Sequence, residues 1–251
     1  MIRVIINGFN GKMGRVVSQL VDAAPDMTIA AGIDVNAPTP QSAFPVYTSI
    51  ADCEATADVV IDFSTADAAA AVIDYAERSR TALVLCTTGL SPATLARVSE
   101  ASRSAAILRS ANMSVGVNLI ARTMPLFAEG LADSGFDVEI VEKHHSQKTD
   151  APSGTALMLA DAVSGGRYSY VYDRTKKRDR RGKNEIGIHA VRGGTIVGEH
   201  TVIFAGRDEV IEITHRATSK EVFAVGAVKA ARFLAGKPAG LYGMDRVMEE
   251  T

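Results

Sequence analysis

The feature that most constrains the fold is an alternation of short apolar runs with helix-like segments in the first half of the chain. The run IRVIING at 2–8 is continuous and β-branched, which is typical of a strand buried on both faces of a parallel sheet. Similar runs follow at 27–34, 57–64 and 81–89. The segments 14–24 and 66–79 have the apolar spacing or the alanine content of helices. Strands that alternate with helices predict an α/β fold with right-handed crossovers.

The pattern changes after residue 112. Residues 114–135 have the spacing of one long helix, and Pro125 predicts an interruption or kink in it. From 136 onward, alternating apolar and polar residues predict strands in antiparallel pairing, at 136–143, 185–194, 195–206 and 209–218. A last helical segment, 221–236, is expected to return to the first domain.

Composition narrows the class of protein. The chain has 251 residues, 47% of them hydrophobic, and a net charge of −2, which argues against a nucleic-acid or membrane-surface binder. Its two cysteines, Cys53 and Cys86, form no CxxC pair, so we expect neither a disulfide nor a zinc site. No run of about 18 apolar residues occurs. We therefore expect a soluble, cytoplasmic protein.

A glycine-rich segment, NGFNGKMGR at 7–15, lies between the first strand and the first helix. Gly8, Gly11 and Gly14 follow the spacing GxxGxxG rather than the strict GxGxxG of dinucleotide-binding loops. Asp34 ends the second strand, where an acid can accept the hydroxyls of an adenosine ribose. Strand, loop, helix and acid together predict a dinucleotide site. The alternative is a plain strand-to-helix turn with a capping acid.

The residues after Asp34 bear on the choice of cofactor. An NADP site usually has an arginine there to meet the 2′-phosphate, whereas this chain has Val35 and Asn36. Lys12 in the loop is a cation that can reach a phosphate. We expect NADH to be slightly favoured and NADPH to be tolerated.

The segment VEKHHSQKTDAPSGTA at 141–156 concentrates groups that transfer protons. Neighbouring residues of a strand point to opposite faces, so His144 and His145 cannot do the same work. Pro152 is expected to lie just before a helix that starts near Ser153. The free N–H groups at that helix start can hold a carboxylate, and Lys148 adds a positive charge nearby. The segment predicts a site for a small carboxylate-bearing molecule beside proton-transfer groups.

A simpler interpretation of this segment is that Ser153 only caps the helix, the histidines are loop residues and Lys148 is solvated. A metal site would need further ligands at suitable spacing, and none is nearby, so we expect no metal.

The segment EKHHSQKTDAPSGTA resembles the signature of the 4-hydroxy-tetrahydrodipicolinate reductase (dihydrodipicolinate reductase) family. The likeness extends over the whole chain, through NGFNGKMGR, CTTG at 86–89, SANMSVGVN at 110–118 and GGTIVGEHTVIFAG at 193–206. It implies NAD(P)H-dependent reduction of 4-hydroxy-tetrahydrodipicolinate to tetrahydrodipicolinate, in diaminopimelate and lysine biosynthesis. It also implies a homotetramer.

The resemblance also implies residue roles. His144 resembles the general acid/base and Lys148 the proton donor. The substrate-binding positions are His145, Gly154 and Thr155. The cofactor-binding positions are Gly8, Phe9, Asn10, Gly11, Lys12, Met13, Asp34, Cys86, Thr87, Thr88, Ser110, Ala111, Asn112 and Met113. The chain departs from the family at Cys86, where glycine is frequent, and after Asp34, where a basic residue is frequent.

We therefore expect an α/β protein with two domains. A Rossmann-like parallel-sheet domain at 1–112 and 219–251 binds the dinucleotide. An inserted α+β domain at 113–218, with a mainly antiparallel sheet, serves substrate binding and oligomerisation.

Two other functions stay open: a dehydrogenase of another small amino or keto acid, and a cofactor-sensing regulator without turnover. The basic run 173–183 is expected to be an exposed loop, with a substrate-side or subunit-contact role as alternatives. Three further histidines, His189, His200 and His215, are expected to be structural. Arg192 is left outside the predicted site.

Overall fold

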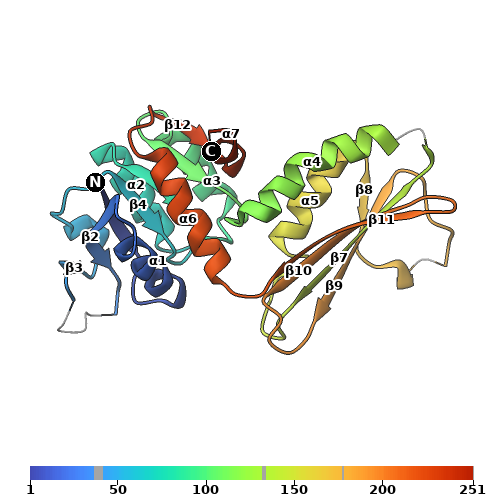
Figure 1. The fold of residues 1–251 in the computed structure, drawn as a ribbon, viewed down its shortest axis with the longest axis horizontal. Coiled ribbons are helices and arrows are strands. Elements are labelled where there is room, and N and C mark those ends of the chain that lie inside the picture. The colour runs from blue at the N-terminus through green and yellow to red at the C-terminus, as the bar shows by residue number, and fades with distance from the viewer. Residues whose placement is uncertain (37–41, 132–133, 177, 251) are drawn as a thin grey trace. The chain divides into compact units, whose positions relative to one another are not determined.

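The structure is a computed structural model that describes residues 1–36, 42–131, 134–176 and 178–250 (Figure 1). It contains a parallel sheet with helices near the N-terminus and a second sheet with two helices in the middle of the chain, so the expected α/β class is confirmed. Within the described ranges, no helix has the length and apolar character needed to cross a membrane.

The chain divides into two compact units. Unit 1 consists of Met1–Ser114 together with Glu221–Thr251, and unit 2 is Val115–Lys220. Each junction lies two residues beyond the one that we expected, after residues 114 and 220 instead of 112 and 218. Unit 2 is therefore an insertion in unit 1.

Seven strands form the sheet of unit 1, in the order β12-β6-β5-β4-β1-β2-β3, and all neighbours run parallel. Their bounds are β1 Ile2–Asn7, β2 Met27–Ile33, β3 Val46–Tyr47, β4 Val59–Asp62, β5 Ala82–Leu85, β6 Ala106–Arg109 and β12 Gly240–Tyr242. The four expected strands are present. The sequence patterns did not indicate β3, β6 and β12, which are short.

The strand order reverses at β1. The strands β2 and β3 lie on one side of β1, and β4, β5 and β6 lie on the other. The loops that follow two strands at such a reversal diverge, which opens a crevice beyond the carboxyl ends of the strands. The glycine-rich segment follows β1 and is therefore at this crevice.

Helices from both ends of the chain cover the sheet of unit 1. The bounds are α1 Lys12–Asp22, α2 Ala69–Ser79, α3 Pro92–Ala101, α6 Glu221–Leu234 and α7 Met244–Glu249, with a short 3-10 helix, η1, at Ile50–Asp52. Apolar residues of α2 and α3 share one core cluster with Ile5, Val60 and Leu83. As expected, α6 returns to the first unit, where it packs against α1, β4 and β5 (Figure 1).

The sheet of unit 2 has the order β11-β10-β7-β9-β8. The bounds are β7 Asp137–His144, β8 Ser169–Val171, β9 Glu185–Arg192, β10 Gly198–Ala205 and β11 Val210–Ala217. Two helices, α4 Val115–Leu131 and α5 Gly154–Ser164, pack on one face, where Val138 and Ile140 are buried as their alternation predicts. A second 3-10 helix, η3, lies at Arg174–Lys176.

One expectation for unit 2 is wrong. Only β10 pairs antiparallel, with β7 and β11, whereas β9 runs parallel to both β7 and β8. The reason is that the chain crosses over through α5 after β7, and a helical crossover returns the next strands in the same direction. The sheet is therefore mixed, and β7 separates β9 from β10. Of the interruption or kink expected at Pro125, the interruption does not occur, since α4 continues through this exposed residue.

Candidate active site and cofactor cavity

The glycine-rich segment forms a tight turn between β1 and α1. Gly8 has a φ of +80°, and a Cβ atom there would lie 2.7 Å from the carbonyl oxygen of Phe63. A Cβ atom at Gly14 would lie 2.1 Å from the carbonyl oxygen of Gly8, so this glycine allows α1 to pack against the loop. Gly11 caps α1 with extended backbone and no side chain. The start of α1 is thereby open to a ligand, which is the arrangement that phosphate groups bind.

Asp34 meets this loop, as predicted. Its carboxylate accepts hydrogen bonds from the backbone N–H groups of Asn10, at 3.1 Å, and Asn36, at 3.0 Å. Asp34, Gly8 and Gly11 line the same cavity, whose volume is ≈ 430 Å³. The glycine turn and the acid after β2 therefore line one cavity in unit 1, and a helix start and a carboxylate are groups that suit a dinucleotide.

The other predicted cofactor residues lie after β1, β5 and β6 and do not share that cavity, as far as the described lining goes. The ring of Phe9 is buried and packs edge-on against Phe44, with 5.8 Å between ring centroids. Lys12 is exposed and Met13 half-buried. Burial raises the pKa of the Cys86 thiol, while Thr88 is exposed.

The loop after β6 carries the remaining predicted cofactor residues. Ser110 donates from Oγ to the carbonyl oxygen of Asn112 at 2.7 Å. Ala111 is exposed and Met113 is buried. These residues thus occupy the carboxyl end of a strand that neighbours β5, in the same unit as the cavity.

One buried acid at this end of the sheet was missed. Asp62, the last residue of β4, is fully buried and accepts hydrogen bonds from Asn7 Nδ2 at 2.7 Å, Ser64 Oγ at 2.6 Å and Thr87 Oγ1 at 2.6 Å. It joins the carboxyl ends of β1, β4 and β5 and fixes the orientation of the Thr87 hydroxyl. The available signal was an acid that ends an apolar run, VVID.

In unit 2, β7 and α5 position the histidine–lysine segment. β7 ends at His144, which is buried, whereas His145 is half-buried, so the two histidines do differ in environment. Ser153 caps α5, and its side chain accepts a hydrogen bond from Ala156 N–H. Gly154 and Thr155 are the first residues of α5, as predicted.

A buried carboxylate that the sequence interpretation missed organises this cluster. Glu142 is fully buried, two residues before His144 on the same face of β7. It accepts hydrogen bonds from His144 Nδ1 at 2.6 Å, from Ser153 N–H at 3.0 Å and from both terminal nitrogens of Arg192 at 2.7 Å. The sequence signal that could have identified Glu142 was its place on the core-facing side of the strand, two residues before a histidine on the same side.

Charge and burial set the protonation states of this pair. Burial would raise the pKa of Glu142, but the hydrogen bonds from Arg192, His144 and Ser153 hold it below its usual value. Burial lowers the pKa of His144, and the Glu142 carboxylate opposes that shift. Lys148 forms an ion pair with Asp150 at 2.7 Å, and Asp150 lies beside Arg192, which donates to its carbonyl oxygen at 2.6 Å.

His200, expected to be structural, belongs to the same cluster. Its ring lies 5.0 Å from that of His144, centroid to centroid, and its Nε2 is 2.9 Å from Ser153 Oγ. Burial, and secondarily the nearby His144, lowers the pKa of His200 to about 4. His200 is therefore neutral near pH 7 and supports the residue that caps α5.

The basic run is only partly the exposed loop that we expected. Arg174 binds the carboxylates of Glu139 and Glu185, and Arg181 binds Asp137 and Glu139. These contacts attach the run to the face of β7 opposite to His144. The other basic residues that the structure describes in the run are exposed, and Lys177 lies outside the described residues.

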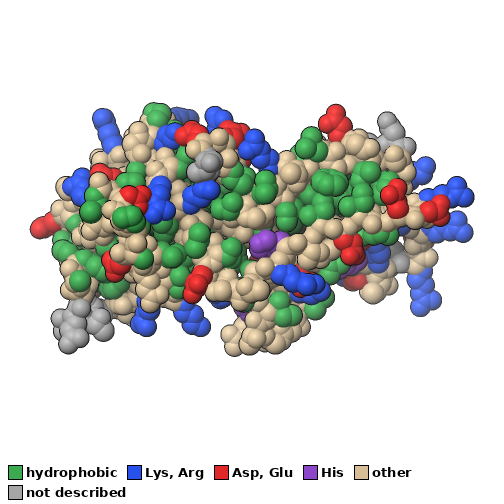
Figure 2. Space-filling view, in the orientation of Figure 1, with side chains coloured by type: hydrophobic (Ala, Val, Ile, Leu, Met, Phe, Trp, Pro, Cys, Tyr) green, Lys and Arg blue, Asp and Glu red, His purple; other side chains and the backbone are tan. Residues whose placement is uncertain are grey.

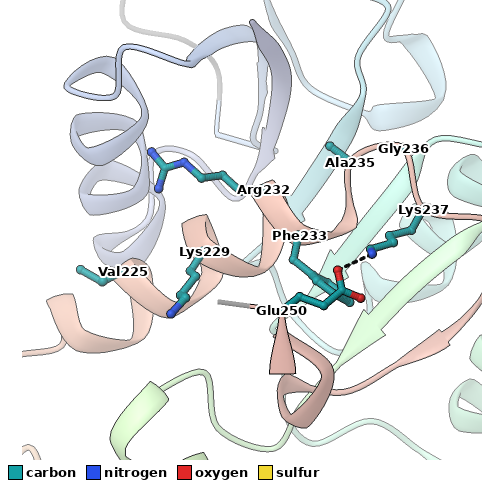
Figure 3. A pocket seen from close by; sticks show the side chains of 8 residues that line it. All are labelled: Val225, Lys229, Arg232, Phe233, Ala235, Gly236, Lys237 and Glu250. Carbon is teal, nitrogen blue, oxygen red and sulfur yellow. Dashed lines mark hydrogen bonds and ion pairs between the residues drawn. The ribbon is translucent and has the colours of Figure 1, made fainter. Parts of the chain in front are cut away.

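A larger cavity, of ≈ 680 Å³, lies along α6 in unit 1 (Figure 3). Two of its cations are paired with acids: Lys237 with Glu250 at 2.5 Å, and Arg232 with Asp26 at 2.7 Å. Lys237 also lies 4.7 Å above the ring of Phe233. The described lining contains none of the predicted site residues, so cavity volume alone does not identify the candidate active site.

Comparison with known proteins identifies the family. Models of the N-terminus and C-terminus of dihydrodipicolinate reductase match residues 2–113 and 116–248. The chain is 51% identical to a 4-hydroxy-tetrahydrodipicolinate reductase of Caldanaerobacter subterraneus subsp. tengcongensis, over 100% of this chain and 99% of the relative. It is 46% identical to one of Clostridium tetani, over 98% and 96% of the two chains.

A solved structure agrees in fold. The dipicolinate-bound dihydrodipicolinate reductase from Paenisporosarcina sp. TG-14 superposes with a TM-score of 0.78 at 24% identity, over 98% of this chain and 99% of that one. Family models that together span almost the whole sequence, and relatives near half identity over the full length, agree with the two-unit fold. The chain belongs to the dihydrodipicolinate reductase family.

Proposed function

We propose that the chain reduces 4-hydroxy-tetrahydrodipicolinate to tetrahydrodipicolinate with a nicotinamide cofactor, in the diaminopimelate and lysine pathway. The observation that carries the proposal is the cluster in unit 2. It places a buried, carboxylate-bound histidine, a lysine and the start of a helix within one segment of chain, in a member of a reductase family. NAD(P)H dependence follows from the same family membership.

Unit 1 is the proposed cofactor site. The backbone of Gly8–Met13 and the start of α1 would hold the pyrophosphate, and Asp34 would accept the ribose hydroxyls. Residues 86–88 and 110–113 are proposed to lie beside the nicotinamide. When bound, the cofactor supplies the hydride.

NADH is proposed as the slightly favoured cofactor, with NADPH also accepted. The carboxylate of Asp34 would repel a 2′-phosphate, and the side chains after it, Val35 and Asn36, are exposed and uncharged. Initial rates with the two cofactors at equal concentration test this. A strong preference for NADPH would contradict it.

Substrate carboxylates are proposed to bind at the start of α5. The backbone N–H of Ser153 is used by Glu142 and that of Ala156 by Ser153 Oγ, while Gly154 is exposed at the first position of the helix. Gly154, Thr155 and His145 are the proposed contacts. The positive end of the helix and Lys148 both favour an anion there.

The ring that accepts a hydride must then be protonated. Burial lowers the pKa of His144, so its neutral form dominates near pH 7 and its ring serves to accept and orient a proton. We therefore assign to the Lys148 ammonium both proton donation and stabilisation of the negative charge that develops on the ring, with His144 as the acid/base partner that accepts a proton. The donor and the histidine both belong to unit 2.

The test follows NADH absorbance while the preceding synthase makes the substrate from pyruvate and aspartate semialdehyde. We expect wild type to oxidise NADH and Lys148→Ala to lose about 10²-fold or more of kcat. Lys143→Ala is the matched control, since Lys143 lies on β7 and pairs with Glu199 on the face opposite to His144. If wild type binds NADH but does not oxidise it, the reductase proposal is wrong and the cofactor-sensing regulator gains support.

We also propose a homotetramer in the cytoplasm. The family resemblance motivates it, and the face of the unit 2 sheet away from α4 and α5 carries half-exposed Val141 and Ile203 that a subunit contact would cover. Light scattering coupled to size exclusion tests the assembly. A monomer at micromolar concentration would contradict it.

A further inference from the structure

Glu142 has the contacts of a residue that positions other groups. Its side chain has no exposed surface, and each of its oxygens accepts two hydrogen bonds. Oε1 accepts from Ser153 N–H and Arg192 Nη2, and Oε2 accepts from His144 Nδ1 and Arg192 Nη1. All four partners are donors, so the ionised carboxylate is fully satisfied, and the forked contact of Arg192 compensates its charge.

This arrangement determines which nitrogen of His144 carries the proton. An ionised carboxylate only accepts hydrogen bonds, so a neutral His144 must hold its proton on Nδ1, which leaves Nε2 as an acceptor. Gly198 of β10 flanks that nitrogen: a Cβ atom there would lie 3.1 Å from Nε2. The glycine therefore keeps the working nitrogen of the ring uncrowded.

The same carboxylate also fixes the start of α5. Ser153, whose N–H it binds, is the capping residue directly before Gly154 and Thr155. Arg192 extends the connection, because its Nη2 also donates to the carbonyl oxygen of Asp150, whose side chain pairs with Lys148. One buried acid thus links the histidine, the helix start and, through Arg192, the lysine segment.

We propose that Glu142 is the positioning residue of the site, which holds His144 in its Nδ1–H tautomer and aligns that ring with the start of α5. Its effect on catalysis rests on the proposed function, whereas its effect on the tautomer does not. The two parts are therefore tested by separate measurements.

The first measurement is nitrogen-15 NMR of histidine-labelled full-length protein in the solid state, with the His144 signals identified by their loss in His144→Gln. In wild type near pH 7 we expect a protonated Nδ1 and a bare Nε2. In Glu142→Gln the backbone N–H of Ser153, which can only donate, needs the amide oxygen. The amide N–H then faces Nδ1 and donates to it, so we expect the opposite tautomer. A wild-type ring protonated on Nε2 would overturn the proposal without any variant, even if Glu142→Gln failed to fold.

The second measurement is steady-state kinetics. We expect Glu142→Gln to lower kcat by about 10² or more with a smaller change in KM, because the ring then presents a protonated Nε2 where an acceptor is needed. In the His144→Gln background the same change should cost little more, because Glu142 acts through His144. Full activity of Glu142→Gln beside an inverted tautomer would overturn the positioning role while leaving the reductase function intact.

Glu139→Gln is the matched control. Glu139 lies three residues earlier on β7. Like Glu142 it binds a histidine, but it binds two arginines instead of one and lies on the opposite face. We expect the His144 tautomer to be unchanged in this variant and kcat to stay within about threefold of wild type, at an oligomeric state confirmed by light scattering. An inverted tautomer in Glu139→Gln would contradict the assignment to Glu142.

Discussion

Two acids of β7, Glu142 and Glu139, both bind a histidine and arginine, but they lie on opposite faces of the strand and differ in their exposure to water. Glu142 binds His144 and Arg192, and Glu139 binds His189 and two arginines. The side chain of His144 is 10% exposed, whereas that of His189 is 40% exposed. Water screens the outer group, while the inner group has only its protein partners. Residue type alone therefore does not mark a site; the face of the strand does.

Surface composition illustrates the outer environment. Figure 2 shows lysine and arginine side chains scattered over the exposed face of the molecule, interspersed with acidic side chains. Ion pairs between exposed side chains each contribute about 0–1 kcal/mol.

The largest contrast is expected from removing one arginine on each face. Arg192→Ala leaves the fully buried Glu142 without its compensating charge and should lower the free energy of unfolding by about 3–5 kcal/mol. Arg174→Ala leaves Glu139 bound to Arg181 and His189 and should cost about 1 kcal/mol or less. Urea unfolding followed by circular dichroism measures both, and equal losses would remove the distinction between the faces.

The next largest difference expected between the two faces of the unit 2 sheet is in how stability depends on pH. The folded-state pKa of His200 is about 4, below the unfolded value of 6.5, so the unfolded chain binds the proton more readily. This contribution is fully present above pH 6.5 and is lost as the pH falls, by about 3 kcal/mol near pH 4.

His200→Gln should therefore flatten the dependence of unfolding free energy on pH between 6.5 and 4. Unfolding titrations of wild type and variant at several pH values measure the two slopes. An unchanged slope in His200→Gln would show that the buried histidine does not resist protonation.

Smaller effects are expected at two glycines, one on each face: substitution of Gly198 should affect catalysis, and substitution of Gly187 should affect stability. A Cβ atom at Gly198 would crowd His144 Nε2 at 3.1 Å, and one at Gly187 would lie 1.8 Å from Glu139 Oε2. Gly198→Ala should lower kcat/KM about tenfold with a small change in stability, whereas Gly187→Ala should cost about 1–3 kcal/mol of stability and spare kcat. The reverse assignment of effects would contradict the roles of the two faces.

The smallest effect is expected at the outer pair of Lys143 and Glu199. Lys143→Ala should change the free energy of unfolding by about 0.5 kcal/mol or less, since Lys143 is more than a third exposed and Arg216 still binds Glu199. Unfolding at low and high salt measures it. A salt-sensitive loss above about 1 kcal/mol would mean that the outer face is less screened than its exposure indicates.

Local patterns predicted much of this molecule. The run at 2–8, the glycine segment and Asp34 each carry a signal within a few residues, and in the structure they meet in one cavity. Alternation along β7 likewise indicated which residues are buried. Strands of two or three residues, such as β3 and β12, offer too few positions for any period to be read.

What could not be predicted depends on which strands become neighbours. His200 pairs with Glu142 across β10 and β7, and Arg192 lies opposite His144 across β9 and β7. Periodicity gives the face of each strand but not its partner or direction, so the parallel β7–β9 pairing and the cluster that it builds were missed. Glu142 itself looked like one acid among several in a charged segment.

The insertion of unit 2 into unit 1 has a consequence for synthesis on the ribosome. Residues 115–220 emerge before α6, which packs against α1, β4 and β5. The apolar surface that α6 covers therefore remains exposed until more than a hundred further residues have been synthesised. During that interval the nascent first unit is a candidate for chaperone binding, while the whole of the second unit is already available to fold.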